Sequence, residues 1–535
     1  MRTLQDIRYS VANRIETYVT TNLGGLWKLV QRVPVVHRRV NRILIDRAIL
    51  KIPTRPNPLT TKAAYTSWAS LTDRTYDSRH LPPAEGERPG HPAAEDVAAL
   101  FNRQGETTLC QKSTVLFPYF AEWFVDGFLR SERPKRDPHT DEVMRDPDTG
   151  EPVRDVAKNE STHEIDLIQI YGLSDEVTRQ LRAGEAGLLQ HQVIDGQEYP
   201  PYLYEGGQKK FDKVSVVRDD QITDDQRRQL FAVGSDTGNL QLGFVIMSVL
   251  FLREHNRIAR TLEKEYGWDD ERLFQTTRNI LTVILIKIVV EEYINHISPY
   301  HLKLLADPTG FRNPRWYRQN WMAIEFNLLY RWHSLVPASF RIADREVGVN
   351  ETLFNTDIVV ERGLGACFED ASNQPAGRVG LFNSPPEVWQ AELASVHQAR
   401  AVKLRPYNQY RRLARFPRAT SFEDVSSDPQ VQQRLRELYG DVDAIEFYPG
   451  LFAEDVRRNA VLPPLIGRMV AIDAFSQAFT NPLLSPRVFN AETFSPLGWN
   501  LIRTTRTLSD LVHRNVPDRA QPLKVTMTRS DWVRT

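Results

Sequence analysis

The sequence has few cysteines, no surplus of charge of either sign and no long unbroken apolar run. Its 535 residues include two cysteines, Cys110 and Cys367, which excludes a disulfide framework and a cysteine-rich metal site and is compatible with a reducing compartment. Basic and acidic residues number 68 each, so the formal net charge is +0 and nucleic acid is not an expected partner. The apolar runs "FVIMSVLFL" and "ILTVILIKIVV" are too short or too interrupted to span a bilayer.

Several common catalytic motifs are also missing. The sequence contains no Gly-rich phosphate loop after a strand, no HExxH motif and no paired cysteines at metal-binding spacing. The stretch "MRTLQDIRYSVANRIETY" lacks an apolar core followed by small residues, so we expect no secretory signal. We therefore expect a cytoplasmic protein without a transmembrane helix, whose chemistry depends on histidine and tyrosine.

Residues 1–52 predict an N-terminal amphipathic helical segment. Ile7, Val11 and Ile15 recur at helical spacing, and the following "LGGLWKLVQRVPVVHRRVNR" mixes Trp27 and aliphatic residues with arginine and lysine. Such a basic, tryptophan-containing stretch suits the surface of a membrane, to which the protein would bind peripherally. The alternative is a helical arm packed on the body of the protein, and the pattern alone favours this alternative slightly.

The remainder, residues 53–535, reads as one mainly α-helical body. Residues 53–100 are rich in proline, glycine and polar residues and predict an extended loop, and 131–161 predicts a charged loop. From about 225 to 300 the pattern indicates long helices, interrupted at "YGWDD" by a break and N-cap signal. Strand patterns are short and sparse throughout, so function is expected to lie between helices.

The segment "EFNLLYRWHSLVP" at 325–337 brings Tyr330 and His333 within one helical turn of each other. His333 could be a satisfied core histidine, a general base or an axial ligand of haem iron. A tyrosine beside an oxidised haem can lose an electron and a proton to give a phenoxyl radical. Taken by itself, however, this segment favours a buried helix end.

Other stretches, read together with this one, resemble a known family. "FLREHNRIARTLEKEYGWDDERLFQTTRNIL" at 251–281 resembles the long-helix signature of the animal haem peroxidase superfamily. "FAVG", "QVIDGQEYPP", "LYGDVDAIEFYPGLF" and "LLYRWHSLVP" are similar to its cyclooxygenase branch and follow in the same order, from about residue 16 to about 515. The resemblance implies a mainly α, cyclooxygenase-like helical fold with haem between central helices, and it makes 53–535 the catalytic domain. The growth-factor-like module and disulfides of the animal enzymes are absent, which indicates a bacterial-type or otherwise intracellular relative.

The resemblance also implies roles for individual residues around the haem. Tyr330 matches the tyrosine that carries the radical, and His333 matches the histidine that ligates the haem iron. Trp332 also matches, and we expect Trp332 and Asn327 beside the cofactor, whereas Arg331 replaces a histidine of the family motif. We expect one non-covalent haem b per chain.

A fatty-acid channel follows from the same resemblance. "EEYINHISPYHLKL" at 291–304 aligns without gaps to the channel segment of the family, and an apolar tunnel suits an acyl chain because each buried methylene contributes roughly 0.8 kcal/mol. The family's carboxylate-binding arginine is replaced by His37, with Arg38 and Arg39 following it. Arg38 is the salt-bridge candidate at that end, and a solvated basic patch is an equally good interpretation. The predicted channel residues are Tyr293, Ile294, Ile297, Tyr300, Phe326, Leu329, Ser476 and Arg38.

The sequence departs from the family at the distal side of the expected haem. The family has glutamine and histidine four residues apart, and "YFAEWFVDGFL" has Glu122 and Asp126 at those positions. An aspartate of ordinary pKa is a poor proton donor at pH 7, so we expect weak peroxidase activity unless burial raises the pKa. Val125 and Gly127 flank Asp126 where the wider superfamily has residues for a haem ester and for calcium, so we expect neither. His139 and His163 farther along are interpreted as surface residues.

Three functional hypotheses follow from the sequence. The first is a haem-dependent fatty-acid dioxygenase of the cyclooxygenase type, with an unsaturated fatty acid and O2 as partners. The second is a haem peroxidase that oxidises small reductants with hydrogen peroxide, and the third is a non-catalytic haem- or lipid-binding relative. Because the module that contributes to the homodimer of animal enzymes is absent, the sequence leaves a homodimer and a monomer open.

Overall fold

The computed structural model describes residues 3–534 except 53–58, 87–89, 136, 138–141, 143, 146, 148–152, 312–313, 317–319 and 517–520. Most of its ordered elements are helices, as the sequence predicts, and the strands form four antiparallel two-stranded ribbons. The strands are β1 (Leu109–Thr114), β2 (Gln192–Ile194), β3 (Gln197–Tyr199), β4 (Tyr204–Glu205), β5 (Gln208–Lys209), β6 (Ser339–Ile342), β7 (Arg345–Gly348) and β8 (Pro375–Gly377). The β1–β8 ribbon joins distant parts of the chain, and the other three ribbons pair neighbouring strands.

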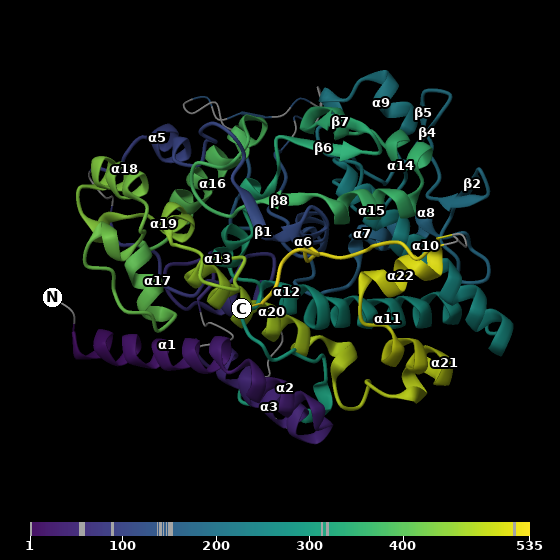
Figure 1. The fold of residues 1–535 in the computed structure, drawn as a ribbon. Coiled ribbons are helices and arrows are strands. Elements are labelled where there is room, and N and C mark those ends of the chain that lie inside the picture. The colour runs from purple at the N-terminus through teal and green to yellow at the C-terminus, as the bar shows by residue number, and fades with distance from the viewer. Residues whose placement is uncertain are drawn as a thin grey trace.

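The N-terminal helices form a layer along one edge of the molecule (Figure 1). They are α1 (Leu4–Asn22), α2 (Gly24–Arg32) and α3 (Pro34–Ile49), and α3 packs against α20 (Pro464–Thr480). The helical character predicted for residues 1–52 is therefore confirmed for the described part of that segment. The stretch 53–100, predicted as loop, contains two short helices, α4 (Trp68–Thr72) and α5 (Ala94–Ala99). A Ser67 capping box starts α4, and α5 buries three small apolar side chains, signals that are easily overlooked in polar surroundings.

Two long helices form the centre of the fold, as predicted. α10 (Leu242–Tyr266) ends where Gly267 adopts a left-handed conformation, and α11 (Asp270–Ile288) begins at Asp269, whose side chain accepts the Arg272 amide hydrogen bond. α11 continues through one π-helical turn, Val289–Tyr293, into α12 (Ile294–Ile297). Such π-turns are frequent at functional sites, since the extra residue reorients the side chains that follow.

The other helices surround this pair. The remaining helices of the first half are α6 (Leu116–Asp126), α7 (Ile168–Tyr171), α8 (Asp175–Leu181) and α9 (Asp224–Gln229). Those of the second half are α13 (Ile324–Leu329), α14 (Asp357–Arg362), α15 (Leu364–Asn373), α16 (Trp389–Ala401), α17 (Tyr407–Leu413), α18 (Pro429–Tyr439), α19 (Phe447–Ala453), α21 (Ala491–Thr504) and α22 (Leu508–Asn515). α6 packs on α10, and α13 packs on both α19 and α20. None of the described helices combines the length and the apolarity that crossing a membrane would require.

Candidate active site

The residues of "LLYRWH" lie where α13 ends. Tyr330 terminates this helix, and His333 starts a short 3-10 helix, so the three side chains of Tyr330, Trp332 and His333 leave the backbone in an irregular turn. The Tyr330 ring stacks on Trp332 with centroids 4.5 Å apart and meets Phe326 edge-on at 4.9 Å. Burial raises the pKa of Tyr330 above its ordinary value, so the phenol is protonated at neutral pH.

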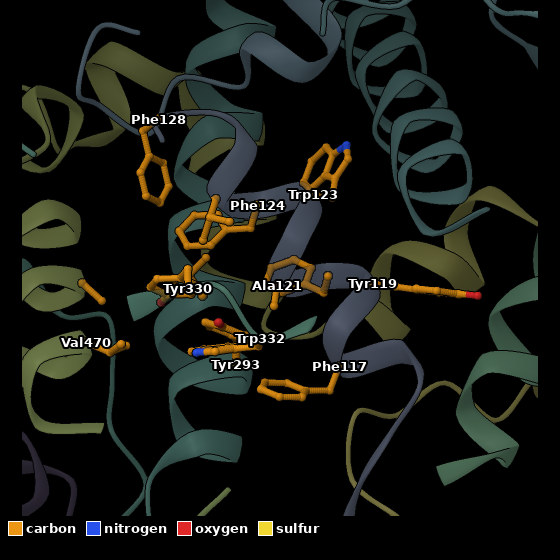
Figure 2. Close-up of a cluster of buried hydrophobic side chains, with 14 of the residues drawn as sticks. Phe117, Tyr119, Ala121, Trp123, Phe124, Phe128, Tyr293, Tyr330, Trp332 and Val470 are labelled. Carbon is orange, nitrogen blue, oxygen red and sulfur yellow. The ribbon is translucent and has the colours of Figure 1, made fainter. Parts of the chain in front are cut away.

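An aromatic cluster from α6 and the π-turn encloses Tyr330 (Figure 2). Tyr293, from the π-turn, lies near the Tyr330 hydroxyl, and burial together with that neighbour raises the pKa of Tyr293 well above its usual range. The Tyr293 ring is 5.6 Å from Phe117 and 5.4 Å from Phe120, both in α6. The phenol of Tyr330 is thus held in a dry, rigid environment.

His333 lies beside a buried carboxylate that the sequence did not indicate. Its Nδ1 is 3.0 Å from Oε1 of Glu392 in α16. The Glu392 side chain is 1% exposed, whereas that of His333 is 17% exposed. The Nδ1 atom of His333 therefore faces the Glu392 carboxylate, and its Nε2 atom is the nitrogen that could ligate a metal.

Glu122 on α6 is close enough to His333 for the two to interact electrostatically. Burial raises the pKa of Glu122, while the charge of His333 and a hydrogen bond from Gln241 Nε2 at 3.0 Å partly oppose that rise. An imidazole ligand with a protonatable carboxyl group nearby, both half-buried, is a donor set that suits a haem with peroxide reactivity. The residues present therefore fit the cofactor that the sequence predicted.

Asp126 has a different environment from Glu122, although both were predicted on the distal side. Its Oδ2 accepts hydrogen bonds from Arg130 Nη1 at 2.9 Å, Ser235 Oγ at 2.5 Å and Thr237 Oγ1 at 2.7 Å. Arg130 also pairs with Asp236. This carboxylate is saturated by donors from the segment that follows its helix and from the loop before α10, which is typical of a structural ion-pair cluster.

Asn327, predicted beside the cofactor, hydrogen-bonds to protein groups. Its Nδ2 donates to Ser131 Oγ at 3.1 Å, and its Oδ1 accepts from Arg331 Nη2 at 2.7 Å. These contacts orient Arg331, the residue that replaces the family's histidine. Burial lowers the pKa of Arg331, but a guanidinium remains charged even so.

A cavity of about 370 Å³ opens between the N-terminal helices, α12 and α20. Three of the predicted channel residues line it, namely Ile294, Ile297 and Tyr300. Val470 of α20 also lines it and lies in the same buried cluster as Tyr330 and Tyr293 (Figure 2). The cavity therefore extends from the N-terminal layer toward the tyrosine pair.

The charged residues that line this cavity, within the described part of the chain, are predominantly cationic: Glu16, Lys51, Arg457, Arg458 and Arg468. Arg468 is 10% exposed, lies 4.1 Å from the centroid of the Phe416 ring and is 3.2 Å from Glu16. Lys51 is 2.5 Å from the same glutamate. Sequence analysis missed this cluster because its members come from three distant segments. The sequence signal that could have indicated this cluster is Lys51, a charged residue between the apolar residues "AIL" and Ile52.

The other predicted channel residues lie in different surroundings. Phe326 and Leu329 are buried in α13 within the core that contains Tyr330. Ser476 is buried in α20, where its hydroxyl donates to the Ile472 carbonyl. Arg38 is not among the residues lining the cavity: its side chain is 66% exposed and pairs with Asp307 at 3.3 Å. The rotation of α3 explains this, since it buries His37 against the Lys303 carbonyl and turns Arg38 outward.

A second buried pair of a histidine and a carboxylate lies near Tyr330 and was not predicted. His80 Nε2 is 3.2 Å from Asp473 Oδ2, and both side chains are 1% exposed. The His80 backbone amide donates to Glu325 of α13 at 3.0 Å, which connects this pair to the helix that ends at Tyr330. The two residues are 393 positions apart, so no local pattern could reveal the contact.

His163 was predicted at the surface, and the structure corrects this. The residue is 1% exposed, its Nε2 lies 2.6 Å from the Arg74 carbonyl, and burial lowers the pKa of the imidazole to about 4. The end of the charged loop pairs with the residues that follow α4, which buries the ring despite its polar sequence context. His139 lies outside the described residues.

Comparison with known proteins gives a consistent result. The sequence model of the family described as "Animal haem peroxidase" matches residues 126–526. "Prostaglandin G/H synthase 2" of Equus caballus is 32% identical over 514 residues, covering 93% of this chain and 80% of the relative, and "Prostaglandin G/H synthase 1" of Mus musculus is 32% identical over 515 residues with the same coverage. Among solved structures, the fatty acid alpha-dioxygenase of Oryza sativa superposes with a TM-score of 0.69 at 16% identity, covering 86% of this chain and 84% of that one. Peroxidase A of Dictyostelium discoideum superposes with a TM-score of 0.65 at 20% identity, covering 85% and 96%.

Proposed function

Because the chain belongs to the animal haem peroxidase family, we propose that it is a haem-dependent fatty-acid dioxygenase of the cyclooxygenase type. The observation that carries this proposal is the buried Tyr330, which shares a hydrophobic cluster with Val470, a residue that lines the cavity (Figure 2). A plain peroxidase needs no such cavity behind its tyrosine. The names of the relatives, which include prostaglandin synthases and fatty acid alpha-dioxygenases, support the same class of substrate.

His333 would hold the haem iron through Nε2, with Trp332 beside the cofactor. When bound, haem would supply the oxidant for Tyr330 after reaction with a peroxide. Tyr330 then loses an electron and its phenolic proton together, since the buried phenol is otherwise neutral. The phenoxyl oxygen takes a hydrogen atom from the fatty acid, which restores the phenol and leaves a carbon radical. O2 adds to this radical, and the resulting peroxyl radical takes the phenolic hydrogen atom of Tyr330, which gives a hydroperoxide and restores the phenoxyl radical.

We assign distal proton transfer to Glu122 rather than to Asp126. A general acid must be protonated before it can donate, and burial raises the pKa of Glu122 above its ordinary value. Asp126 accepts three hydrogen bonds from Arg130, Ser235 and Thr237, so it would be a poor donor. Peroxide activation by a carboxyl group in place of a histidine is expected to be slow, which matches the weak peroxidase activity predicted from the sequence.

The fatty acid would lie with its chain along Ile294 and Ile297 and its carboxylate at the cationic end of the cavity. Lys51 and Arg468 share a single anionic partner, Glu16, so one positive charge is left for the substrate. A carboxylate bound there is desolvated only in part and gains charge-assisted hydrogen bonds. The apolar chain contributes roughly 0.8 kcal/mol for each buried methylene.

The N-terminal helices would bind the surface of a membrane, from which a fatty acid could enter. One face of α1 exposes Ile7, Val11 and Ile15, whose exposed fractions are 51%, 52% and 60%. α2 likewise exposes Leu26 and Leu29, and the sequence intersperses these helices with arginine and lysine. An exposed apolar face rimmed by basic residues fits an anionic lipid surface. Binding to a membrane and a homodimer both remain predictions.

Mass spectrometry of the products formed from linoleic and arachidonic acids under O2 tests the function. Oxygenated fatty acids whose formation requires haem and a trace of peroxide are expected. Rapid oxidation of a phenolic donor by hydrogen peroxide, without lipid oxygenation, would instead favour the plain peroxidase. If haem-loaded protein shows neither activity, the non-catalytic haem- or lipid-binding protein is the hypothesis that remains.

A further inference from the structure

Glu392 has the features of a residue that acts through His333. Its carboxylate comes from α16, lies in the protein interior at 1% exposure, and approaches the Nδ1 atom of His333 to 3.0 Å. In this structure the imidazole ring is not aligned for a regular hydrogen bond with it. The distance nevertheless permits that bond after a small rotation of the histidine, which is the more exposed partner.

The carboxylate itself is firmly held. Ser384 Oγ donates to Oε1 at 2.7 Å, and the Tyr448 hydroxyl in α19 donates to Oε2 at 2.5 Å. The guanidinium of Arg331 is near enough to interact with its charge. Two hydroxyl donors and a nearby cation stabilise an ionised Glu392, which compensates for the cost of burying it. The Glu392 carboxylate is therefore held in position independently of His333, and it can impose an orientation on the imidazole ring.

We propose that Glu392 is a positioning residue that accepts the Nδ1–H of His333 and makes this imidazole an electron-rich ligand. The inference rests on the proposed function, since it requires haem bound at Nε2 of His333. A carboxylate behind a ligating histidine selects the tautomer, fixes the ring plane and raises the basicity of the ligand. A more basic ligand stabilises ferric over ferrous iron and so lowers the midpoint potential. This role also compensates for the distal side, where a carboxyl group replaces the expected histidine.

The test compares haem-loaded full-length protein with its Glu392→Gln variant. Glutamine is isosteric: its amide oxygen accepts from one of the Ser384 and Tyr448 hydroxyls, and its amide nitrogen donates to the other once that hydroxyl has rotated, so the fold is retained while the anionic acceptor is lost. We expect at least a tenfold higher ratio of ferrous to ferric haem at a fixed potential, which is 59 mV for one electron. The iron–histidine stretching frequency of the ferrous protein is expected to fall. Glu387→Gln removes the same charge at an exposed position five residues earlier and is the matched control, expected to change neither quantity.

A second variant keeps the proposal falsifiable if Glu392→Gln does not fold. Tyr448→Phe removes one donor but leaves the carboxylate, which then accepts more strongly from His333, so the midpoint potential is expected to move in the opposite direction. Unchanged potential and stretching frequency in Glu392→Gln, or in Tyr448→Phe if Glu392→Gln does not fold, would overturn the role of Glu392. Failure of the proposed function looks different: haem would then bind equally well to wild-type protein and to His333→Ala.

Discussion

The guanidinium of Arg468 in α20 lies 3.2 Å from the carboxylate of Glu16 in α1, although 452 positions separate the two residues. Lys51, just after α3, pairs with the same carboxylate. The N-terminal helices therefore contribute charged groups to the wall of the cavity that is proposed to take the fatty acid. Their removal would expose that cavity as well as delete a membrane-binding surface.

Binding of a fatty-acid anion is expected to weaken as the pH rises above about 8. Burial and the charge of Arg468 lower the pKa of Lys51 to about 8, so free protein loses this ammonium charge above that pH. A bound carboxylate favours the charged form and shifts the midpoint upward. Dissociation constants measured against pH should show this loss in the wild type. Lys51→Arg should keep its affinity at high pH, and a wild-type profile that is flat up to pH 10 would contradict the assignment.

Replacing Tyr330 by phenylalanine should abolish fatty-acid-dependent oxygen uptake and leave the haem absorbance spectrum intact. The change removes a single buried hydroxyl and keeps the stacking on Trp332 at 4.5 Å, so the fold is retained. Oxygen-electrode traces with linoleic acid and a trace of peroxide provide the measurement. Tyr293→Phe, which removes the neighbouring buried phenol, is the matched control and should retain uptake. Equal uptake by Tyr330→Phe and wild type would refute the radical assignment.

Glu122→Gln should slow activation by hydrogen peroxide by about 10²–10⁴-fold, the usual contribution of a general acid–base group. Burial raises the pKa of Glu122, so the wild-type rate should also fall as pH rises through that pKa and the donor deprotonates. Stopped-flow absorbance of haem-loaded protein mixed with peroxide measures both effects. Retention of the wild-type rate and pH profile in the variant would assign proton transfer to another group.

Asp126→Ala should lower the free energy of unfolding by about 1–3 kcal/mol, because buried donors of Arg130, Ser235 and Thr237 lose their acceptor while Arg130 keeps its pair with Asp236. The Arg130 and Asp126 side chains are 6% and 13% exposed. Denaturant unfolding measures the loss. The control is Asp225→Ala, which breaks an exposed pair with Arg228 at 3.0 Å and should cost no more than about 1 kcal/mol. If the Asp126→Ala variant is as stable as the wild type but no longer reacts with peroxide, Asp126 has a chemical role instead.

Replacing both Leu26 and Leu29 by serine should reduce co-sedimentation with vesicles of anionic lipid. These side chains are 48% and 60% exposed, so the change removes apolar surface without disturbing the core. Val193→Ser, on the β2–β3 ribbon, removes an equally exposed apolar side chain and should leave binding unchanged. Vesicle binding that is the same in all three proteins would argue against α2 as the membrane contact.

Local sequence signals predicted the local structure well. The break between α10 and α11 follows from Gly267, which tolerates the left-handed conformation, and from Asp269, whose side chain caps the next helix. Both effects act within a few residues, so they are visible in the sequence. The loop prediction for the polar stretch before residue 100 was wrong at α5. This short helix is stabilised by burial against α16, which local sequence signals do not show.

By itself, the sequence determined the family and the helical fold, and its colinear motifs point to Tyr330 and His333 as the candidate radical and ligand residues. Tertiary structure alone decided what surrounds them. The contact of Glu392 with His333, the separate environments of Glu122 and Asp126, and the cationic end of the cavity join segments tens to hundreds of residues apart. Distances of that kind depend on how helices pack, and burial then sets the pKa values of the groups enclosed. No spacing along the chain records either quantity.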